Sequence, residues 1–389
     1  MGRNNKIEIS IVMPALNEER SIGICIEKAL KTLKANKIKN FEIIVADNGS
    51  TDRTREIAKK MGAKVLIEEK KGYGNAYIKG LNAAQGKYIV IGDSDDSYDW
   101  TDIMRFIKPL KEENYDMVIG TRFKTGKIEK KAMPWHHKYI GNPLLSGILN
   151  LFFKTGVTDA HCGMRSFTKE AYRKMNLQMP GMEFATEMVI KAARVGLKIK
   201  EIPITLHRDA RGGKKSHLKS FSDGWRHLRL MLLFSPNWLF IIPGILFLFL
   251  GALFFVWVQI SFPVFGHPLG SHFSALALFF FMFGIQIIIL GIYAKTYSFY
   301  ENLDIHDNFI KKFLNIFTVN RGISIGIVLV VAGFIIDLLI IIEWIKKNFG
   351  ALSRINSVLF ATCLMITGFQ IIFSSFFIGL IKMNKEHKL

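Results

Sequence analysis

Cysteine is scarce in this sequence, with only three in 389 residues. Cys25, Cys162 and Cys363 are far apart, form no C-x-x-C pair and have no histidine at ligand spacing. This pattern excludes a disulfide scaffold and argues against a zinc site. The first residues also lack the continuous apolar stretch of a secretory signal peptide. We therefore expect reduced thiols and no secretory leader.

Acidic residues are also few: 32 Asp and Glu stand against 52 Lys and Arg, which gives a formal net charge of +20. A charge of this size is compatible with binding to nucleic acid. The basic residues, however, cluster beside long apolar segments rather than along an aromatic-lined face. An anionic membrane surface explains that placement better. We predict a membrane partner and no nucleic-acid partner.

Long apolar runs are confined to the part of the chain after about residue 236. Four of them, at about 238–258, 273–293, 323–342 and 358–381, reach the roughly 20 residues that a helix needs to cross ~30 Å of hydrocarbon. The sequence therefore predicts a soluble domain over 1–215, an amphipathic juxtamembrane helix over 216–236, and a transmembrane domain with four helices over 237–389.

The basic residues are unevenly distributed around these runs. The connection 259–272 has no Lys or Arg, whereas the segment before the first run has Lys214, Lys215, Lys219, Arg226 and Arg229. The positive-inside bias predicts a cytoplasmic N-terminal domain in a multi-pass protein of the cell inner membrane or its equivalent. Lys346, Lys347 and Arg354 fall on the opposite side and conflict with this bias. Asp337, inside the third run, has either a direct role or a hydrogen bond to a neighbouring helix.

The N-terminal domain alternates between two kinds of segment. β-branched and apolar runs over 7–14, 41–47, 63–68, 88–92 and 117–120 predict strands, and helical patterns over 21–33, 51–61, 74–84 and 101–110 separate them. This alternation predicts an α/β fold with a mostly parallel sheet covered by helices. Ligands of such sheets bind beyond the carboxyl ends of the strands.

Polar clusters follow the first four predicted strands, where ligands of such a sheet bind. They are PALNEE from Pro14, DNGSTD from Asp47, KKGYGNA from Lys70 and GDSDDSYD from Gly92. The third cluster offers glycines and lysines at a helix start, which suits phosphate, although an ordinary helix start explains it equally well. It does not match the P-loop pattern. Convergence of all four is more specific than any one alone.

The fourth cluster is acidic, with Asp93, Ser94, Asp95 and Asp96 directly after the apolar strand YIVIG. Several carboxylates this close repel one another unless a cation lies between them. A hard divalent cation that also binds substrate phosphates is the natural occupant. A solvated turn is the alternative. With the phosphate-suited loop nearby, we favour a metal site at Asp93 and Asp95.

These motifs, in this order and spacing over about residues 7–236, resemble family 2 glycosyltransferases of the GT-A fold. The resemblance is closest to the polyprenyl-phosphate branch, which includes dolichyl-phosphate mannose synthase and undecaprenyl-phosphate sugar transferases. It implies a GT-A nucleotide-sugar-binding domain with a mostly parallel central sheet, interfacial helices and a four-helix transmembrane domain. It further implies metal-dependent, inverting transfer of a hexosyl unit from a nucleoside diphosphate sugar to a polyprenyl phosphate lipid, and it allows a homo-oligomer.

The resemblance also implies roles for individual residues. The nucleotide would contact Pro14, Ala15, Asn17, Glu18, Asp47, Asn48, Lys71, Gly72, Gly74 and Asp93. Mg²⁺ or Mn²⁺ would bind Asp93 and Asp95, and the catalytic set would be Asp95, Arg122, Arg165 and Arg211. The sugar and acceptor would contact Glu183, Glu187, Arg208, Lys214 and Ser216. The sequence departs from the family with Asn48 in place of a second Asp and Ser97 in place of a Gln.

Two further segments have amphipathic character. Residues 139–153 and 216–234 combine apolar positions with basic or polar ones, which is typical of helices in the membrane interface. Core packing explains the first of them as well. His136, His137 and His161 lack ligand-spaced partners, so we interpret them as packing or interfacial residues rather than metal ligands.

Two alternative functions have distinguishing features. A processive polysaccharide synthase shares the fold and the spans but carries a Q-x-x-R-W signature, which this sequence lacks. A non-catalytic lipid-binding membrane protein with a relict transferase domain would not need the D-x-D at Asp93 and Asp95, which is intact.

A phosphate acceptor requires no catalytic base, because a phosphate monoester with a second pKa of about 6 is largely dianionic near neutrality.

Overall fold

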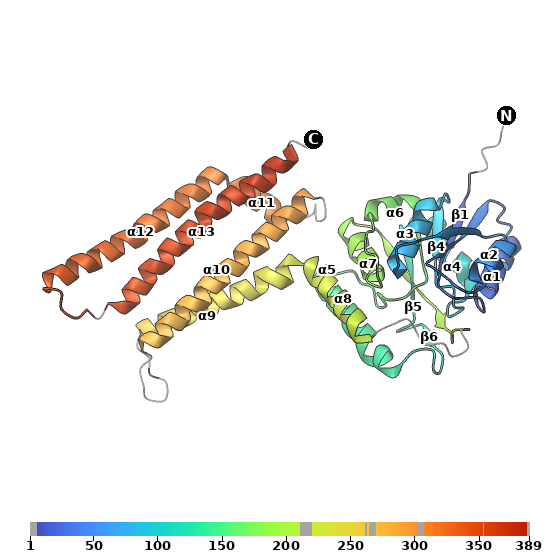
Figure 1. Ribbon diagram of the computed structural model, residues 1–389, viewed down its shortest axis with the longest axis horizontal. Coiled ribbons are helices and arrows are strands. Elements are labelled where there is room, and N and C mark those ends of the chain that lie inside the picture. Colours follow the sequence, from blue (N-terminus) through green and yellow to red (C-terminus); the bar gives the residue numbers. More distant parts are fainter. Residues whose placement is uncertain are drawn as a thin grey trace. The chain divides into compact units, whose positions relative to one another are not determined.

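The computed structural model describes residues 6–210, 220–260, 263, 270–301, 307–352 and 354–386. The chain divides into two compact units, Met1–Phe234 and Ser235–Leu389. Figure 1 draws both units, coloured along the sequence. Helix α8 (Ser220–Leu233) groups with the first unit, where it contacts α5 (Asn142–Phe153) and α7 (Phe184–Arg194). The three-part division expected from the sequence stays a prediction.

A seven-stranded sheet forms the centre of the first unit. Its strands are β1 (Ile9–Ala15), β2 (Phe41–Asp47), β3 (Lys64–Ile67), β4 (Tyr88–Ile91), β5 (Met117–Thr121), β7 (Arg165–Thr168) and β8 (Ile199–Pro203), in the order β3-β2-β1-β4-β7-β5-β8. Only β7 runs antiparallel to its neighbours among these strands. The predicted mostly parallel sheet is confirmed.

Helices cover the sheet and bury its strands. They are α1 (Ile22–Ala35), α2 (Thr54–Lys60), α3 (Tyr73–Ala83), α4 (Ile103–Glu112) with the short η1 (Trp100–Asp102), α6 (Lys169–Met175) and α7. α1 contacts α2 and α4, whereas α7 contacts α3 and α6, so the helices form two groups, with the sheet between them (Figure 1). β1 and β4 are buried along their whole length, which explains their continuous apolar sequences.

Pairing along the chain brings the carboxyl ends of three strands to one edge of this sheet. β1 lies between β2 and β4, with Ala15 paired to Asp47 and Val12 paired to Ile91. A second, two-stranded sheet of β6 (Lys127–Ile128) and β9 (Thr205–Leu206) lies apart from the central one. The polar clusters after β1, β2 and β4 are therefore neighbours in space.

Helices α5 and α8 each have a buried face and an exposed apolar face. On α5, which follows the π-helical turn η2 (His137–Gly141), Leu149 is buried and Leu151 is exposed. On α8, Met231 is buried and Phe221 and Trp225 are exposed. Exposed large apolar groups beside a folded core are typical of helices that lie in a membrane interface.

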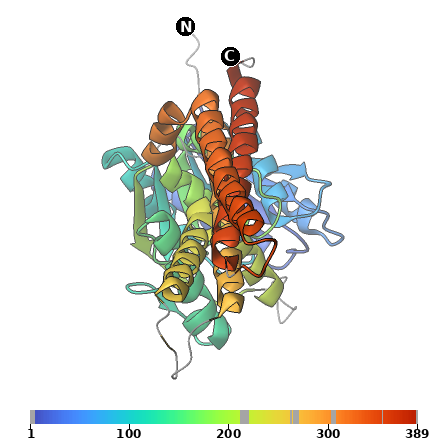
Figure 2. The same ribbon diagram turned by 90° about the vertical axis from the view of Figure 1, so that its left-hand side faces the viewer.

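The second unit consists mainly of long apolar helices. They are α9 (Ile242–Gln259) after η3 (Asn237–Ile241), α10 (Ser271–Tyr300), α12 (Val319–Lys346) and α13 (Ile355–Glu386), with the short α11 (Asn308–Ile316) between α10 and α12. The candidate membrane spans are Asn237–Gln259, His272–Tyr300, Val319–Lys346 and Ile355–Met383, which confirms the four predicted spans. α10 contacts α9 and α13, and α12 contacts α13, as Figure 2 shows for α12 and α13.

Glycines allow these helices to approach closely. A Cβ atom at Gly326 of α12 would collide with the backbone of Gly368 on α13, and the reverse also holds. Gly284 of α10 meets the backbone of Gly244 on α9 in the same way. Small residues at such contacts are typical of helix association in lipid, where van der Waals contact replaces the hydrophobic effect.

Candidate active site

The loops after β1 and β2 form one hydrogen-bonded structure. The backbone N–H of Asn17 donates to Ser50 Oγ at 2.9 Å, and Thr51 N–H donates to Asn17 Oδ1 at 2.9 Å. Glu18 N–H donates to Thr54 Oγ1 at 2.8 Å. Asn17 has a φ of 58°, a left-handed conformation that asparagine tolerates better than most residues. The two loops therefore present a fixed surface at the carboxyl edge of the sheet.

Asp47 lies beneath this surface and is fully buried. Its Oδ1 accepts from Gly49 N–H and Ser50 N–H at 3.1 Å each and from Arg55 Nε at 2.6 Å. Its Oδ2 is buried as well, yet accepts from no described residue. A buried carboxylate oxygen without a donor is costly. This atom is suited to accept from an N–H or O–H of a bound molecule.

The side chain of Asn48, unlike that of Asp47, forms hydrogen bonds with the backbone of the loop after β3. Its Nδ2 donates to the carbonyl oxygens of Glu68 and Lys70 at 3.1 and 2.9 Å, and its Oδ1 accepts from Gly72 N–H at 2.7 Å. The amide therefore holds the loop after β3 against the loop after β2. This geometry supports a structural role, and direct contact with a nucleotide remains only a prediction.

The glycines of the third loop have a structural explanation too. A Cβ atom at Gly74 would collide with the carbonyl oxygen of Met179, and one at Gly72, which has a φ of 143°, would collide with that of Pro180. Asn75 N–H donates to the same Pro180 oxygen at 3.2 Å. Residues 179–180 thus lie against the start of α3. This packing explains the two glycines without a ligand, and their expected contact with the nucleotide stays a prediction.

The D-x-D carboxylates are oriented by neighbouring hydroxyl groups. Asp93 Oδ1 accepts from the Tyr73 hydroxyl at 2.8 Å. Asp95 Oδ1 accepts from both N–H and Oγ of Ser97, at 3.1 and 2.6 Å. Between them, Ser94 Oγ donates to the carbonyl of Pro14 at 2.6 Å, which ties this turn to the end of β1. Ser97 therefore fixes the orientation of the second carboxylate.

The third carboxylate of the cluster already has a cation. Asp96 Oδ1 lies 2.7 Å from Lys28 Nζ. In the part of the chain that the structure describes, no group of three or more His, Cys, Asp or Glu side chains could hold a metal by itself. Asp93 and Asp95 fit instead the way Mg²⁺ binds in phosphate-transferring sites, through one or two carboxylates together with the substrate phosphates.

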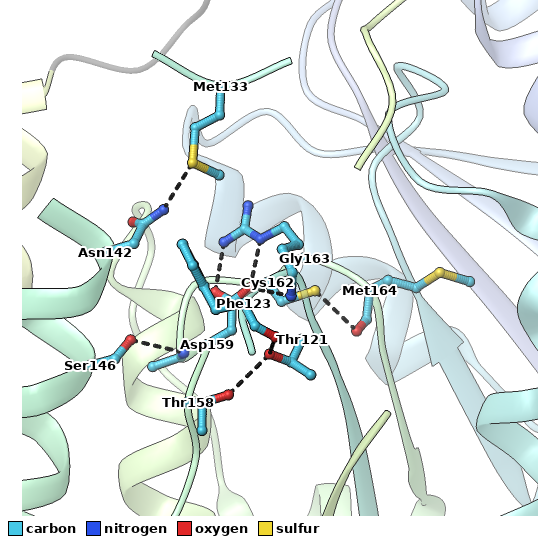
Figure 3. A network of polar contacts seen from close by, with 12 residues as sticks. Thr121, Phe123, Met133, Asn142, Ser146, Thr158, Asp159, Cys162, Gly163 and Met164 are labelled. Atoms are coloured by element: carbon cyan, nitrogen blue, oxygen red, sulfur yellow. Dashed lines mark hydrogen bonds and ion pairs between the residues drawn. The ribbon is translucent and has the colours of Figure 1, made fainter. Parts of the chain in front are cut away.

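Arg122 forms a buried ion pair that the sequence did not predict. Its Nε donates to Asp159 Oδ2 and its Nη2 to Asp159 Oδ1, at 2.7 Å each, and its backbone N–H donates to Oδ2 at 3.0 Å. Asp159 is fully buried and Arg122 is 8% exposed. Figure 3 shows Asp159 at the centre of this network. The guanidinium is thus already paired with a carboxylate, and the catalytic role expected of Arg122 stays a prediction.

Helix α5 supports the segment that carries Asp159. Ser146 Oγ accepts from Ala160 N–H at 3.2 Å, and Figure 3 shows Ser146 pointing from α5 toward this segment. Glu201 Oε1 accepts from the N–H groups of Thr158 and Asp159 at 2.7 and 3.1 Å. Asp159 immediately precedes the A-H-C-G-M-R motif, and this position beside a motif was the signal available in the sequence.

The side chain of Arg165 also forms hydrogen bonds within the protein. Its Nε, Nη1 and Nη2 donate to the carbonyl oxygens of Cys162, Ala185 and Ala160, at 2.8 Å each. The side chain is 1% exposed. This guanidinium joins β7 to the start of α7, and its expected catalytic role stays a prediction.

The two glutamates of the G-M-E-F-A-T-E segment differ in environment. Glu187 is fully buried, accepts from Gln178 N–H and Met179 N–H at 3.0 and 2.8 Å, and pairs with Lys191 at 2.7 Å. It shapes residues 178–179, which is a structural role. Glu183 Oε2 is buried without a described partner, so Glu183 is the better placed of the two for a ligand.

The remaining predicted site residues lie at the surface or outside the description. Arg208 is exposed, and its Nε donates to the Lys130 carbonyl at 2.8 Å. Lys71 is also exposed. Arg211, Lys214 and Ser216 lie outside the described residues.

A pair of buried histidines lies where α7 and α8 meet. The rings of His161 and His227 are 4.6 Å apart, edge to face, and Thr186 Oγ1 lies 2.7 Å from His227 Nδ1. Burial lowers the pKa of His227 to about 4, against the smaller opposing effects of Glu183 and Asp223. Burial likewise holds the pKa of His161 well below its usual range. Both rings are therefore neutral near pH 7, which agrees with the interpretation of His161 as a packing residue.

Because these histidines are buried in the neutral form, we expect the free energy of unfolding to fall in acid. His227 has a folded pKa of about 4 and an unfolded value of about 6.5, so only the unfolded chain takes up a proton between these values. The stabilisation is complete above about pH 6.5 and falls as the pH drops toward 4, by an amount on the order of 3 kcal/mol. His227→Gln, which keeps a partner for Thr186 but does not titrate, should flatten this part of the profile. An unchanged slope in denaturant titrations from pH 7 to 4 would contradict the assignment.

Comparison with known proteins identifies the family. Residues 10–175 match the model of glycosyl transferase family 2, and residues 292–382 match the family 2 C-terminal transmembrane region. The low-salt glycan biosynthesis hexosyltransferase Agl6 of Haloferax volcanii is 38% identical over 371 residues, 95% of this chain and 88% of that protein. An uncharacterized protein of Methanocaldococcus jannaschii, MJ1222, is 41% identical over 51% of this chain and 82% of its own length.

Solved structures include glucosyl-3-phosphoglycerate synthase from Mycobacterium tuberculosis. It is 24% identical, with a TM-score of 0.47, over 58% of this chain and 79% of that one. The assignment rests instead on the alignment with Agl6 along most of both chains and on the two family models. The chain is therefore a multi-pass membrane glycosyltransferase of the GT-A fold that belongs to glycosyltransferase family 2.

Proposed function

We propose that this glycosyltransferase moves a hexosyl unit from a nucleoside diphosphate sugar to the phosphate of a membrane polyprenyl phosphate, with inversion, on the cytoplasmic side of the membrane. The main support for this proposal is that Asp47, Asp93 and Asp95 lie at the same edge of the sheet. The same chain has four candidate spans, which suits an acceptor that is itself a lipid.

The donor nucleoside would bind at the joined loops after β1 and β2. Asp47 Oδ2 is a buried acceptor without a described donor, and the imide of a base or a ribose hydroxyl supplies such a donor. Asn17 and Glu18 have backbone groups fixed by the second loop, so this surface needs little rearrangement on binding. Preorganisation of this kind lowers the cost of binding.

The donor diphosphate would lie beside Asp93 and Asp95, which would hold Mg²⁺ or Mn²⁺. When bound, such an ion neutralises the charge that develops on the leaving diphosphate. Tyr73 and Ser97 keep the two carboxylates in fixed orientations through the hydrogen bonds at 2.8 and 2.6 Å. This preorganisation spares the chain a reorganisation during the reaction.

The acceptor phosphate would react without a protein base, since its second pKa of about 6 leaves it largely dianionic near neutrality. The chain must then align two anions. Exposed Arg208 and, outside the described residues, Arg211, Lys214 and Ser216 are the proposed contacts. A phosphate that reached Arg122 would have to share this guanidinium with Asp159.

The test of this function is a donor panel. Inverted membrane vesicles containing the protein are incubated with labelled UDP-glucose, GDP-mannose, UDP-N-acetylhexosamines and a pentose donor. We expect label from one hexose donor in chloroform-extractable lipid, and none in sealed right-side-out vesicles, because nucleotide sugars do not cross the bilayer. Label found only in a water-soluble product or a polymer would contradict a polyprenyl phosphate acceptor.

Substitution of Asp47 should affect binding of the sugar nucleotide and not that of the acceptor. Asp47→Ala should weaken nucleoside diphosphate binding by about 10-fold to 100-fold, since a hydrogen bond to a charged acceptor contributes roughly 1.5–3 kcal/mol. Arg55→Met is the matched control, because it removes the 2.6 Å ion pair but leaves Oδ2 in place. Isothermal titration compares the two variants. Equal weakening by both would show that Asp47 acts through the loop and not on the nucleotide.

A further inference from the structure

Two amide side chains meet in the middle of the second unit. Gln286 stands at the midpoint of the candidate span His272–Tyr300, and Gln370 stands next to the midpoint of Ile355–Met383. Gln370 Nε2 donates to Gln286 Oε1 at 2.7 Å. Because both spans cross the bilayer, this pair lies near the membrane midplane.

The amide pair borders an open hollow between α10 and α13. The hollow has a volume of about 350 Å³ and is lined mainly by apolar side chains, with Leu290 and Tyr293 from α10 and Phe369 and Phe373 from α13. Gln286 is exposed on this side, as are Leu290, Phe369 and Phe373. The surface is thus an apolar rim around one exposed amide.

The hydrogen-bonding capacity of this pair is not filled within the described residues. Gln286 Nε2, on the exposed side of the pair, donates to none of them. Water is absent from the hydrocarbon core, so a polar group left without a partner there is costly. A partner with a donor and an acceptor at this depth would remove that cost.

A partner for the Gln286 amide needs both a hydrogen-bond donor and an acceptor. An acyl or polyisoprenoid chain could cover the apolar rim, but it has neither donor nor acceptor at the midplane. A carboxamide has both, so two copies of Gln286 related by a two-fold axis can donate to and accept from each other. Polar side chains of this kind join transmembrane helices in known cases.

We infer that α10 and α13 form the interface of a homodimer within the membrane, with Gln286 of each copy hydrogen-bonded to Gln286 of the other. Leu290, Phe369 and Phe373 surround this contact and exclude lipid from it. Gln370 orients the amide through its 2.7 Å hydrogen bond. The interface concerns the second unit alone and does not depend on which sugar or acceptor the first unit uses.

The experiment measures dimerisation of the full chain in lipid vesicles, by single-molecule photobleaching over a range of dilutions. We expect Gln286→Leu to raise the dimer dissociation constant at least tenfold and Gln286→Asn to have a smaller effect. Gln259→Leu is the matched control, since Gln259 is exposed at the end of α9, away from the midplane, and it should leave the constant unchanged. A wild-type chain that is monomeric at every dilution, with lipid over the hollow, would overturn the inference, as would a dimer insensitive to Gln286→Leu.

A second measurement keeps the wild-type amide. In a chain whose three cysteines are replaced by serine, Phe373→Cys should form a disulfide between copies in the membrane, because Phe373 is 69% exposed on the rim. Leu339→Cys, exposed on α12, should not. Crosslinking at Leu339 but not at Phe373 would place the interface elsewhere and overturn the inference.

Discussion

Replacement of Asp95 by asparagine is expected to lower the turnover of sugar transfer by about 10³-fold, the upper range for loss of one preorganised electrostatic contact. The reason is the loss of a carboxylate that would hold the metal on the donor diphosphate. Ser97 can still bond to the amide, since it now bonds to Asp95 Oδ1 at 2.6 Å, so the turn should keep its shape. Initial rates at saturating donor measure the effect.

Asp96 supplies the control for this prediction. Asp96→Asn changes the adjacent carboxylate, which pairs with Lys28 at 2.7 Å, and asparagine tolerates its φ of 64°. We expect a change in turnover of a few-fold at most, as for the loss of a partly exposed ion pair. Chelation should inactivate the wild type, and Mg²⁺ or Mn²⁺ should restore it. Full activity of Asp95→Asn in the presence of a chelator would refute the metal site.

Replacement of Asp159 by leucine is expected to destabilise the first unit by about 3–5 kcal/mol, because removal of one partner leaves a buried charge uncompensated. Asp159 is fully buried and binds Arg122 through two hydrogen bonds of 2.7 Å. Arg122→Leu should cost a similar amount for the same reason. The double variant should be more stable than either single variant, since neither charge remains buried.

Chemical unfolding of the purified protein, followed by tryptophan fluorescence, compares these variants in a double-mutant cycle. Additive effects of the two single substitutions would contradict a coupled buried pair. Arg122→Lys is informative as well, because an ammonium group cannot reproduce the bidentate contact of the guanidinium. We expect it to be less stable than the wild type but more stable than Arg122→Leu.

The sheet could be predicted from the sequence because its strands are buried on both faces. β1 and β4 are buried throughout, so they appear as continuous apolar runs, and β2 was predicted with its observed limits, Phe41–Asp47. The positions of Asp47, Asp93 and Asp95 followed from the same pattern, since Asp47 is the last residue of β2 and the D-x-D begins two residues after the end of β4. The four spans were equally clear from length and composition.

The partners of the buried arginines could not be predicted. Whether Arg122 is a free cation depends on Asp159, which is distant in the sequence and reaches it only through tertiary structure. Arg165 binds three carbonyl groups, and backbone acceptors leave no signal in the side-chain pattern. Gly72 and Gly74 looked suited to phosphate, and the sequence did not show that their missing side chains also make room for the backbone of residues 179–180. Local composition shows which residues carry a charge or allow unusual backbone conformations. The groups that these residues contact are determined by the fold.

The most direct measurement of the proposed function is the mass and anomeric configuration of the lipid product. The purified full chain is incubated in vesicles with polyprenyl phosphate, Mg²⁺ and the donor identified by the panel. We predict a polyprenyl phosphate that has gained one hexosyl unit, β-linked from an α-linked donor, because a single displacement by the phosphate inverts the anomeric carbon. An unmodified polyprenyl phosphate beside a glycosylated soluble acceptor or a polymer, or an α-linked product, would contradict the account.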